Sequence, residues 1–209
     1  ETNGLRLVLF NAAQGNWEAG ERGIAAVPGR EAEFDAAISR AAGYARVLGN
    51  KLVHVMAGLE TQGASRSTFI ANLRRGADRV AGDGLTLIIE PINTRDMPGY
   101  FLNRTTQALD ILADVGRANV GLQFDLYHRH IMDGDVEAGL REAKTVIRHM
   151  QIASPPDRGE PGKGELDFKR LFDVIDRSGY EGYIGLEYKP RAGTVPGLAW
   201  AKALGVRFS

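Results

Sequence analysis

Four polar residues, each within or at the end of a short apolar run, have the chemistry of a site for a hard metal ion. Glu90 follows LTLII, Asp125 follows NVGLQF, and Glu187 follows GYIGL, while Gln151 lies within IRHMQIA. Three carboxylates brought together repel one another strongly unless a cation lies among them. Three carboxylates and an amide oxygen suit Mg²⁺ or Mn²⁺ better than Zn²⁺, which usually takes a histidine or a cysteine.

The elements that must position these residues are short strands alternating with helices. The run before Glu90 is β-prone and bounded by Gly84 and Pro91, which predicts a buried strand. Strands are also predicted at residues 4–11, 51–57, 119–125, 147–153 and 182–187, and helices at 30–48, 67–81, 105–115, 135–144, 168–178 and 197–204. This alternation predicts parallel strands joined by right-handed crossovers.

Two α/β architectures fit this order of elements: an open doubly wound sheet, or a TIM (β/α)8-type barrel with only about six βα units in the chain. A dinucleotide-binding sheet would need a Gly-x-Gly-x-x-Gly turn after a strand, and the sequence has none. Acids at the carboxyl ends of several strands favour a barrel, because all those ends face one mouth. No linker divides the chain, so residues 1–209 are predicted to form a single barrel domain.

Composition excludes several classes of protein. The 26 basic and 26 acidic residues give zero formal charge, which argues against a nucleic-acid or anionic-membrane surface. The absence of cysteine excludes disulfides and thiolate sites and is compatible with a cytoplasmic protein. The apolar runs are too short to span a bilayer. Because the chain starts at Glu1 without a methionine, we expect the native N-terminus and any targeting segment to be missing.

Six motifs, in this order along the whole chain, resemble the hydroxypyruvate isomerase family, which includes 2-oxo-tetronate isomerases, within the xylose isomerase-like TIM-barrel superfamily. They are WEAGERGIAAVPGRE at 17–31, IEPIN at 89–93, QFDLYH at 123–128, HMQIA at 149–153, RGEPGKGE at 158–165 and LEYKP at 186–190. The resemblance implies a divalent metal held by Glu90, Asp125, Gln151 and Glu187. It also implies that Glu90 and Glu187 form the proton-transfer pair.

The resemblance further implies an eight-stranded barrel, so that two βα units would be missing at the N-terminus. Residues 4–11 and 182–187 would then be strand edges that need cover. We expect either preceding residues or a partner chain, such as a second copy in a homo-oligomer, to cover them.

Three histidines are candidates for a place near the substrate. His128 lies three residues after Asp125; a histidine so placed contacts substrate in the related ketose epimerases, and the alternative is a loop-surface residue. His54 lies within a predicted strand, where it either reaches substrate or is a barrel-interior side chain. His149 has the strand parity of Gln151 and is expected to support the metal site rather than to bind the ion.

Two basic residues and two aromatic residues complete the candidates. Arg158 could bind a substrate carboxylate in fork geometry, or pair with Glu160 or Glu165 of its own loop. Lys189 could bind substrate or neutralise charge near the metal, and the alternative is an ordinary loop lysine. Trp17 and Tyr100 could form an apolar wall or lid over the mouth, or simply anchor their loops.

The sequence therefore predicts a metal-dependent aldose-ketose-type isomerase of carbohydrate metabolism. Its small-molecule substrate would be a short hydroxy-oxo acid, either hydroxypyruvate or a 2-oxo-tetronate, converted through an enediolate. A ketose 3-epimerase acting on a neutral sugar is the nearest alternative. An apurinic-endonuclease-like phosphodiesterase and a non-catalytic sugar-acid binding protein are more distant ones.

Overall fold

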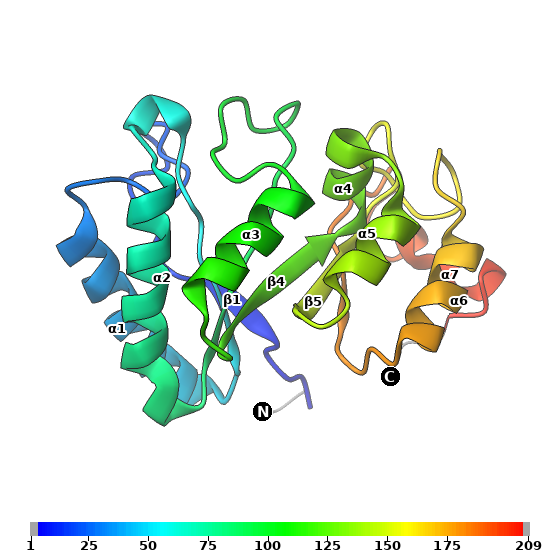
Figure 1. Cartoon of the computed structure of the whole chain (residues 1–209). Coiled ribbons are helices and arrows are strands. Elements are labelled where there is room, and N and C mark those ends of the chain that lie inside the picture. Colours follow the sequence, from blue (N-terminus) through cyan, green and yellow to red (C-terminus); the bar gives the residue numbers. More distant parts are fainter. Residues whose placement is uncertain (1–3, 207–209) are drawn as a thin grey trace. The chain divides into compact units, whose positions relative to one another are not determined.

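The computed structural model describes residues 4–206 and divides the chain into two compact units, one ending at Gln123 and the other beginning at Phe124. Strands alternate with helices along the chain, as predicted (Figure 1). The ends of the predicted domain, residues 1–3 and 207–209, lie outside the described residues.

The first unit contains parallel strands that pair in chain order. They are β1 (Leu9–Asn11), β2 (Leu52–His54), β3 (Thr86–Ile89) and the beginning of β4 (Val120–Asp125). Strands β1 and β2 are shorter than predicted. The N–H of Val55 still donates to the carbonyl of Ile88 in β3. Beyond it, the carbonyls of Met56 and Ala57 accept hydrogen bonds from the loop residues Ala25 and Ala26.

Three helices of the first unit, α1 (Glu31–Leu48), α2 (Arg66–Val80) and α3 (Thr105–Val115), lie side by side over the strands (Figure 1). Phe34, Ile38, Phe69 and Leu73 are fully buried and form part of the core. Gly49 and Gly116 end α1 and α3 in the left-handed conformation, as their positions in the sequence predict.

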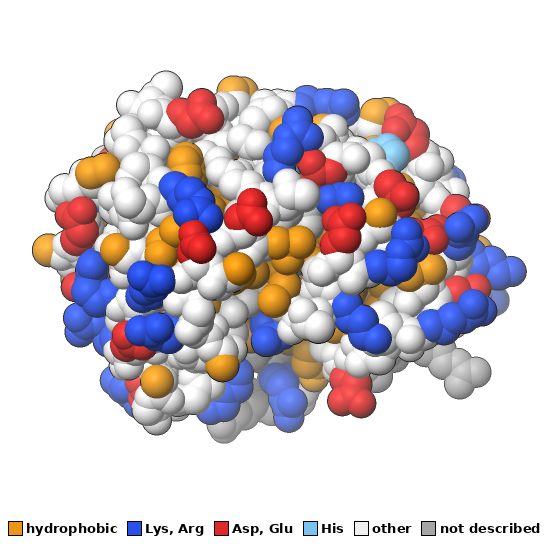
Figure 2. Space-filling view, viewed as in Figure 1, with side chains coloured by type: hydrophobic (Ala, Val, Ile, Leu, Met, Phe, Trp, Pro, Cys, Tyr) orange, Lys and Arg blue, Asp and Glu red, His pale blue; other side chains and the backbone are white. Residues whose placement is uncertain are grey.

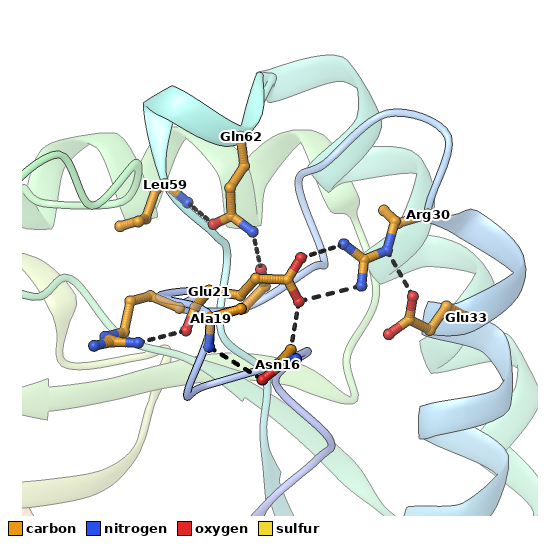
Figure 3. Close-up of polar contacts among 9 residues, drawn as sticks. Asn16, Ala19, Glu21, Arg30, Glu33, Leu59 and Gln62 are labelled. Carbon is orange, nitrogen blue, oxygen red and sulfur yellow. Dashed lines mark hydrogen bonds and ion pairs between the residues drawn. The ribbon is translucent and has the colours of Figure 1, made fainter.

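The long loop between β1 and α1 is fixed by a network of polar contacts (Figure 3). The Glu21 carboxylate pairs with Arg30 at 2.6 Å and accepts the backbone N–H of Asn16 at 2.5 Å. Arg30 also pairs with Glu33 at 2.6 Å, and Gln62 donates to the carbonyl of Gly23. These contacts tie the loop to the first turn of α1 and to the segment after β2.

The second unit contains β5 (Ile147–Ile152) and β6 (Ile184–Leu186), which pair in parallel with Gln151 opposite Gly185. Its helices are α4 (Leu126–Asp133), α5 (Val136–Ala143), α6 (Phe168–Ser178) and α7 (Trp200–Ala203). The sequence reading missed α4 and expected a loop there. The Asp125 carboxylate accepts the N–H of Tyr127 at 2.8 Å and so caps this helix.

Within the described part of the chain, no helix is both long and apolar enough to cross a membrane.

Replacing Tyr100 with Phe should destabilise the first unit, because the fully buried Tyr100 hydroxyl accepts the backbone N–H of Ala57 at 2.9 Å. Without that acceptor, the buried N–H loses its partner at a cost of about 1–3 kcal/mol in the free energy of unfolding. Urea unfolding followed by circular dichroism measures the change. The control, Tyr44→Phe, removes a hydroxyl from a ring that is 58 % exposed and should change stability by less than about 0.5 kcal/mol.

Candidate metal and catalytic site

Asp125 and His128 form the buried part of a cluster in the second unit. Asp125 ends β4 and is 3 % exposed, and His128 lies on the first turn of α4, also at 3 %. Nε2 of His128 is 3.7 Å from Oδ2 of Asp125. His128 is therefore a buried helix residue, so the alternative of a loop-surface histidine is wrong.

Glu187 follows β6 and brings a second carboxylate to the cluster. Its backbone N–H donates to the carbonyl of Ile152 at 3.2 Å, which keeps it beside the end of β5. Partial burial raises the pKa of Glu187, and the neighbouring Asp125 raises it further. Arg158 opposes this shift, since its guanidinium pairs with the Glu187 carboxylate at 2.6 Å.

Asp125, His128 and Glu187 each offer a ligand atom, and these atoms lie within 4.8 Å of one another. Two carboxylates this close carry a repulsion that a cation would relieve. Carboxylate oxygens suit hard divalent ions, and one imidazole nitrogen widens the choice to softer ones. The cluster can therefore hold a metal ion. The sequence predicts that His128 binds substrate, whereas the structure places its ring nitrogen among the possible metal ligands. In the sequence, only the spacing of three residues from Asp125 indicates this position.

Gln151 and His149 lie on the same face of β5, over Gly185 of β6. A Cβ atom on Gly185 would come within 3.1 Å of both Cγ of Gln151 and Nε2 of His149, so the missing side chain leaves them room. Glu187 shares the face of Gly185, two residues further along. His149 is buried, and its Nδ1 has no hydrogen-bond partner among the described residues.

Glu90 lies in the first unit, directly after β3, and is 4 % exposed. Nε2 of His54 is 3.5 Å from Oε2 of Glu90, which places the predicted substrate-binding histidine against this glutamate. Tyr100 is completely buried and its hydroxyl accepts the backbone N–H of Ala57, so a role as a lid is wrong and its contact is that of a loop anchor. Burial raises the pKa of Tyr100, and the charge of Glu90 adds to that shift.

The remaining candidates lie in loops. Lys189 is exposed, and its backbone N–H donates to the carbonyl of Arg158 at 2.7 Å. The two loop acids suggested as partners of Arg158 pair elsewhere, Glu160 with Arg191 and Glu165 with His130.

Trp17 is 47 % exposed, and the guanidinium of Arg22 lies 3.9 Å from its ring centre. Its ring is thus covered on one face and open to solvent elsewhere, which leaves its predicted lid role untested.

Comparison with known proteins gives a consistent family. Residues 1–204 match the family model described as "Xylose isomerase-like TIM barrel". A 2-oxo-tetronate isomerase of Cupriavidus necator is 53 % identical, over 97 % of this chain and 79 % of the relative. The hydroxypyruvate isomerase of Escherichia coli K12 is 43 % identical, over 95 % and 79 %.

A solved structure from Brucella melitensis, titled as an AP endonuclease of family 2, has a TM-score of 0.93 and 45 % identity. The match covers 97 % of this chain and 80 % of that one. Together with the family model, it decides between the two architectures in favour of the TIM barrel.

The buried ring of His149 should make stability depend on pH. Desolvation lowers its pKa from 6.5 to about 4. Between these values the unfolded chain binds a proton that the folded protein does not, so stability falls as the pH falls. At about 1.4 kcal/mol per pH unit the loss reaches about 3 kcal/mol. The measurement is urea unfolding of wild type and His149→Leu from pH 7.5 to 4. The wild type should lose this stability relative to the variant below pH 6.5, and parallel curves would contradict the assignment.

Proposed function

Because the chain belongs to the hydroxypyruvate isomerase family of xylose isomerase-like TIM barrels, whose curated relatives are isomerases, we propose that it isomerises a short hydroxy-oxo acid. The substrate is hydroxypyruvate or a 2-oxo-tetronate. The observation that carries this proposal is the meeting of two strand-end acids, Asp125 and Glu187, with His128 of α4 in a chain so similar to these enzymes.

The metal ligands in this proposal are Glu90, Asp125, Gln151 and Glu187, with His128 beside them. Gln151 and Glu187 share a face of the second unit, because Gln151 pairs with Gly185 and Glu187 follows two residues later. The oxygen-rich donor set fits Mg²⁺ or Mn²⁺.

The reaction moves one proton between neighbouring carbons of the substrate. One glutamate takes the proton from the carbon beside the carbonyl, and an enediolate forms. A proton is then delivered to the former carbonyl carbon while the hydroxyl proton moves between the two oxygens, so no external reductant is needed. Glu90 and Glu187 are the proton-transfer pair. A bound divalent ion would stabilise the negative charge on the two oxygens of the enediolate.

Arg158 is proposed to bind the carboxylate of the substrate. Its guanidinium lies against the Tyr127 ring, with 5.3 Å between the guanidinium carbon and the ring centre, and pairs with Glu187. A substrate carboxylate offers the same fork geometry as the glutamate and would compete for this guanidinium. His128 and Lys189 are proposed to contact the same substrate.

The wider setting of the protein is also a proposal: a single barrel domain, a cytoplasmic location, no nucleic-acid partner, and assembly as a homo-oligomer. Acidic and basic side chains are interspersed over the face shown in Figure 2. That pattern supports a small-molecule substrate rather than a polyanion. Because a similar structure carries an endonuclease title, incubation with abasic DNA belongs beside every isomerase assay.

Removing either proton-transfer glutamate should abolish isomerisation. Glu90→Gln and Glu187→Gln keep the shape of the side chain but cannot accept a proton, so kcat on hydroxypyruvate should fall at least about 100-fold. Proton NMR with Mg²⁺ or Mn²⁺ present follows the conversion. The matched control is Glu181→Gln, an exposed acid before β6, which should keep full activity. A fully active Glu90→Gln enzyme would remove Glu90 from this role.

Replacing Arg158 should weaken binding of an acidic substrate. Arg158→Met loses a charge-assisted hydrogen bond of about 1.5–3 kcal/mol, so KM for hydroxypyruvate should rise about 10- to 100-fold. Arg191→Met is the control, because Arg191 pairs with Asp157 and Glu160 of the same loop instead. Steady-state kinetics on hydroxypyruvate and on a neutral ketose distinguish an isomerase of hydroxy-oxo acids from a ketose 3-epimerase. An unchanged KM for the acid, with conversion of the neutral sugar, would favour the 3-epimerase.

A further inference from the structure

Two polar side chains meet where β1 and β2 end. Asn11 and His54 are register partners in the parallel pair, and Nδ1 of His54 lies 3.1 Å from Oδ1 of Asn11. The backbone N–H of Ala12 donates to the carbonyl of His54 at 2.9 Å, which holds the two strand ends together. An amide oxygen can only accept, so this contact assigns the ring proton of His54 to Nδ1.

The other side of the same ring faces Glu90. His54 pairs in register with Ile88, and Glu90 lies two residues further on the same face. Nε2 of His54 is 3.5 Å from Oε2 of Glu90, and both side chains are at least 95 % buried. In the neutral ring, a proton on Nδ1 leaves the lone pair on Nε2, the nitrogen that faces Glu90. A lone pair and an ionised carboxylate repel, so this contact becomes a hydrogen bond only when Glu90 carries a proton.

We propose that Asn11 is a positioning residue, which fixes the tautomer and rotation of His54 so that the ring presents its Nε2 lone pair to Glu90. Resting on the proposed isomerase function, this gives Glu90 an acceptor for its O–H once it has taken a proton from the substrate. His54 thus acts through Glu90, in addition to any contact with substrate.

Hydrogen bonds hold the backbone on both sides of Asn11, the last residue of β1. The loop that follows it is tied by Glu21 to Asn16 and Arg30, and by Gln62 to Gly23 (Figure 3). The β1 end is in turn bonded to β2 through Ala12. Asn11 itself is exposed, so its substitution removes the contact to His54 without opening a cavity in the core.

The test combines ring-nitrogen NMR with kinetics. In ¹⁵N-histidine-labelled protein, long-range ¹H–¹⁵N correlations report which ring nitrogen of His54 carries the proton; we expect Nδ1 in the wild type. Asn11→Leu should lose this preference and lower kcat on hydroxypyruvate about 10- to 100-fold, as removal of an orienting partner does, with KM within about twofold. Asn11→Asp keeps an acceptor for Nδ1–H and should restore most of the Nδ1 tautomer and most of kcat.

Asn50→Ala is the matched control. Asn50 precedes the same strand at its other end, and its amide donates to the carbonyl of Leu52 at 2.9 Å. This variant should keep both kcat and the His54 tautomer, and circular dichroism confirms folding of all variants.

Three results would overturn the assignment while wild-type isomerase activity stands: a wild-type proton on Nε2, full kcat in Asn11→Leu, or an Asp variant no better than the Leu variant. Absence of isomerase activity in the wild type would instead refute the proposed function. The NMR result would then report only on the contact between Asn11 and His54.

Discussion

Repulsion between carboxylates brought to the ends of parallel strands is the constraint on which this site depends. Two unit charges 4 Å apart repel by about 1 kcal/mol in water and by about 4 kcal/mol at an effective dielectric constant of about 20. In the second unit, Asp125 and Glu187 meet under this constraint. Burial is the largest cause of the raised pKa of Glu187, and the charge of Asp125 raises it further. Arg158 and His128 lie beside these acids and oppose the shift, so the cluster is arranged around a place for positive charge.

The surrounding fold keeps these groups where their charges matter. One carboxylate oxygen of Asp125 accepts the N–H of Tyr127. This contact caps α4 and places His128 on the first turn of the helix. Glu187 is held to β5 through its backbone, while Gly185 leaves room for Gln151 and His149. In the first unit, Asn11 contacts His54, the neighbour of Glu90, by a single hydrogen bond. Uncharged groups therefore help to orient several of the functional side chains.

Much of the fold could be read from the sequence because its signals are local. The helix stops at Gly49 and Gly116 follow from glycine's access to the left-handed conformation, and the cap at Asp167 follows from a short acceptor side chain before an apolar face. Strand lengths were less predictable: β1 begins later than its apolar run, and β2 ends before Met56 and Ala57, whose carbonyls bond to the loop after β1. Helix α4 differs from the predicted loop because Asp125, a candidate metal ligand in the sequence, is also the N-cap of this helix.

The sequence by itself determined which chemistry is available: acids at the ends of apolar runs, an arginine in a later loop, and motifs of one isomerase family, because residue type and spacing are written in the chain. Only the tertiary structure decided which of these groups meet. It paired Arg158 with Glu187 rather than with a loop acid, buried His128 beside Asp125, and set His54 between Asn11 and Glu90. Those choices depend on strand register and on competition between partners far apart in sequence, which no local pattern encodes.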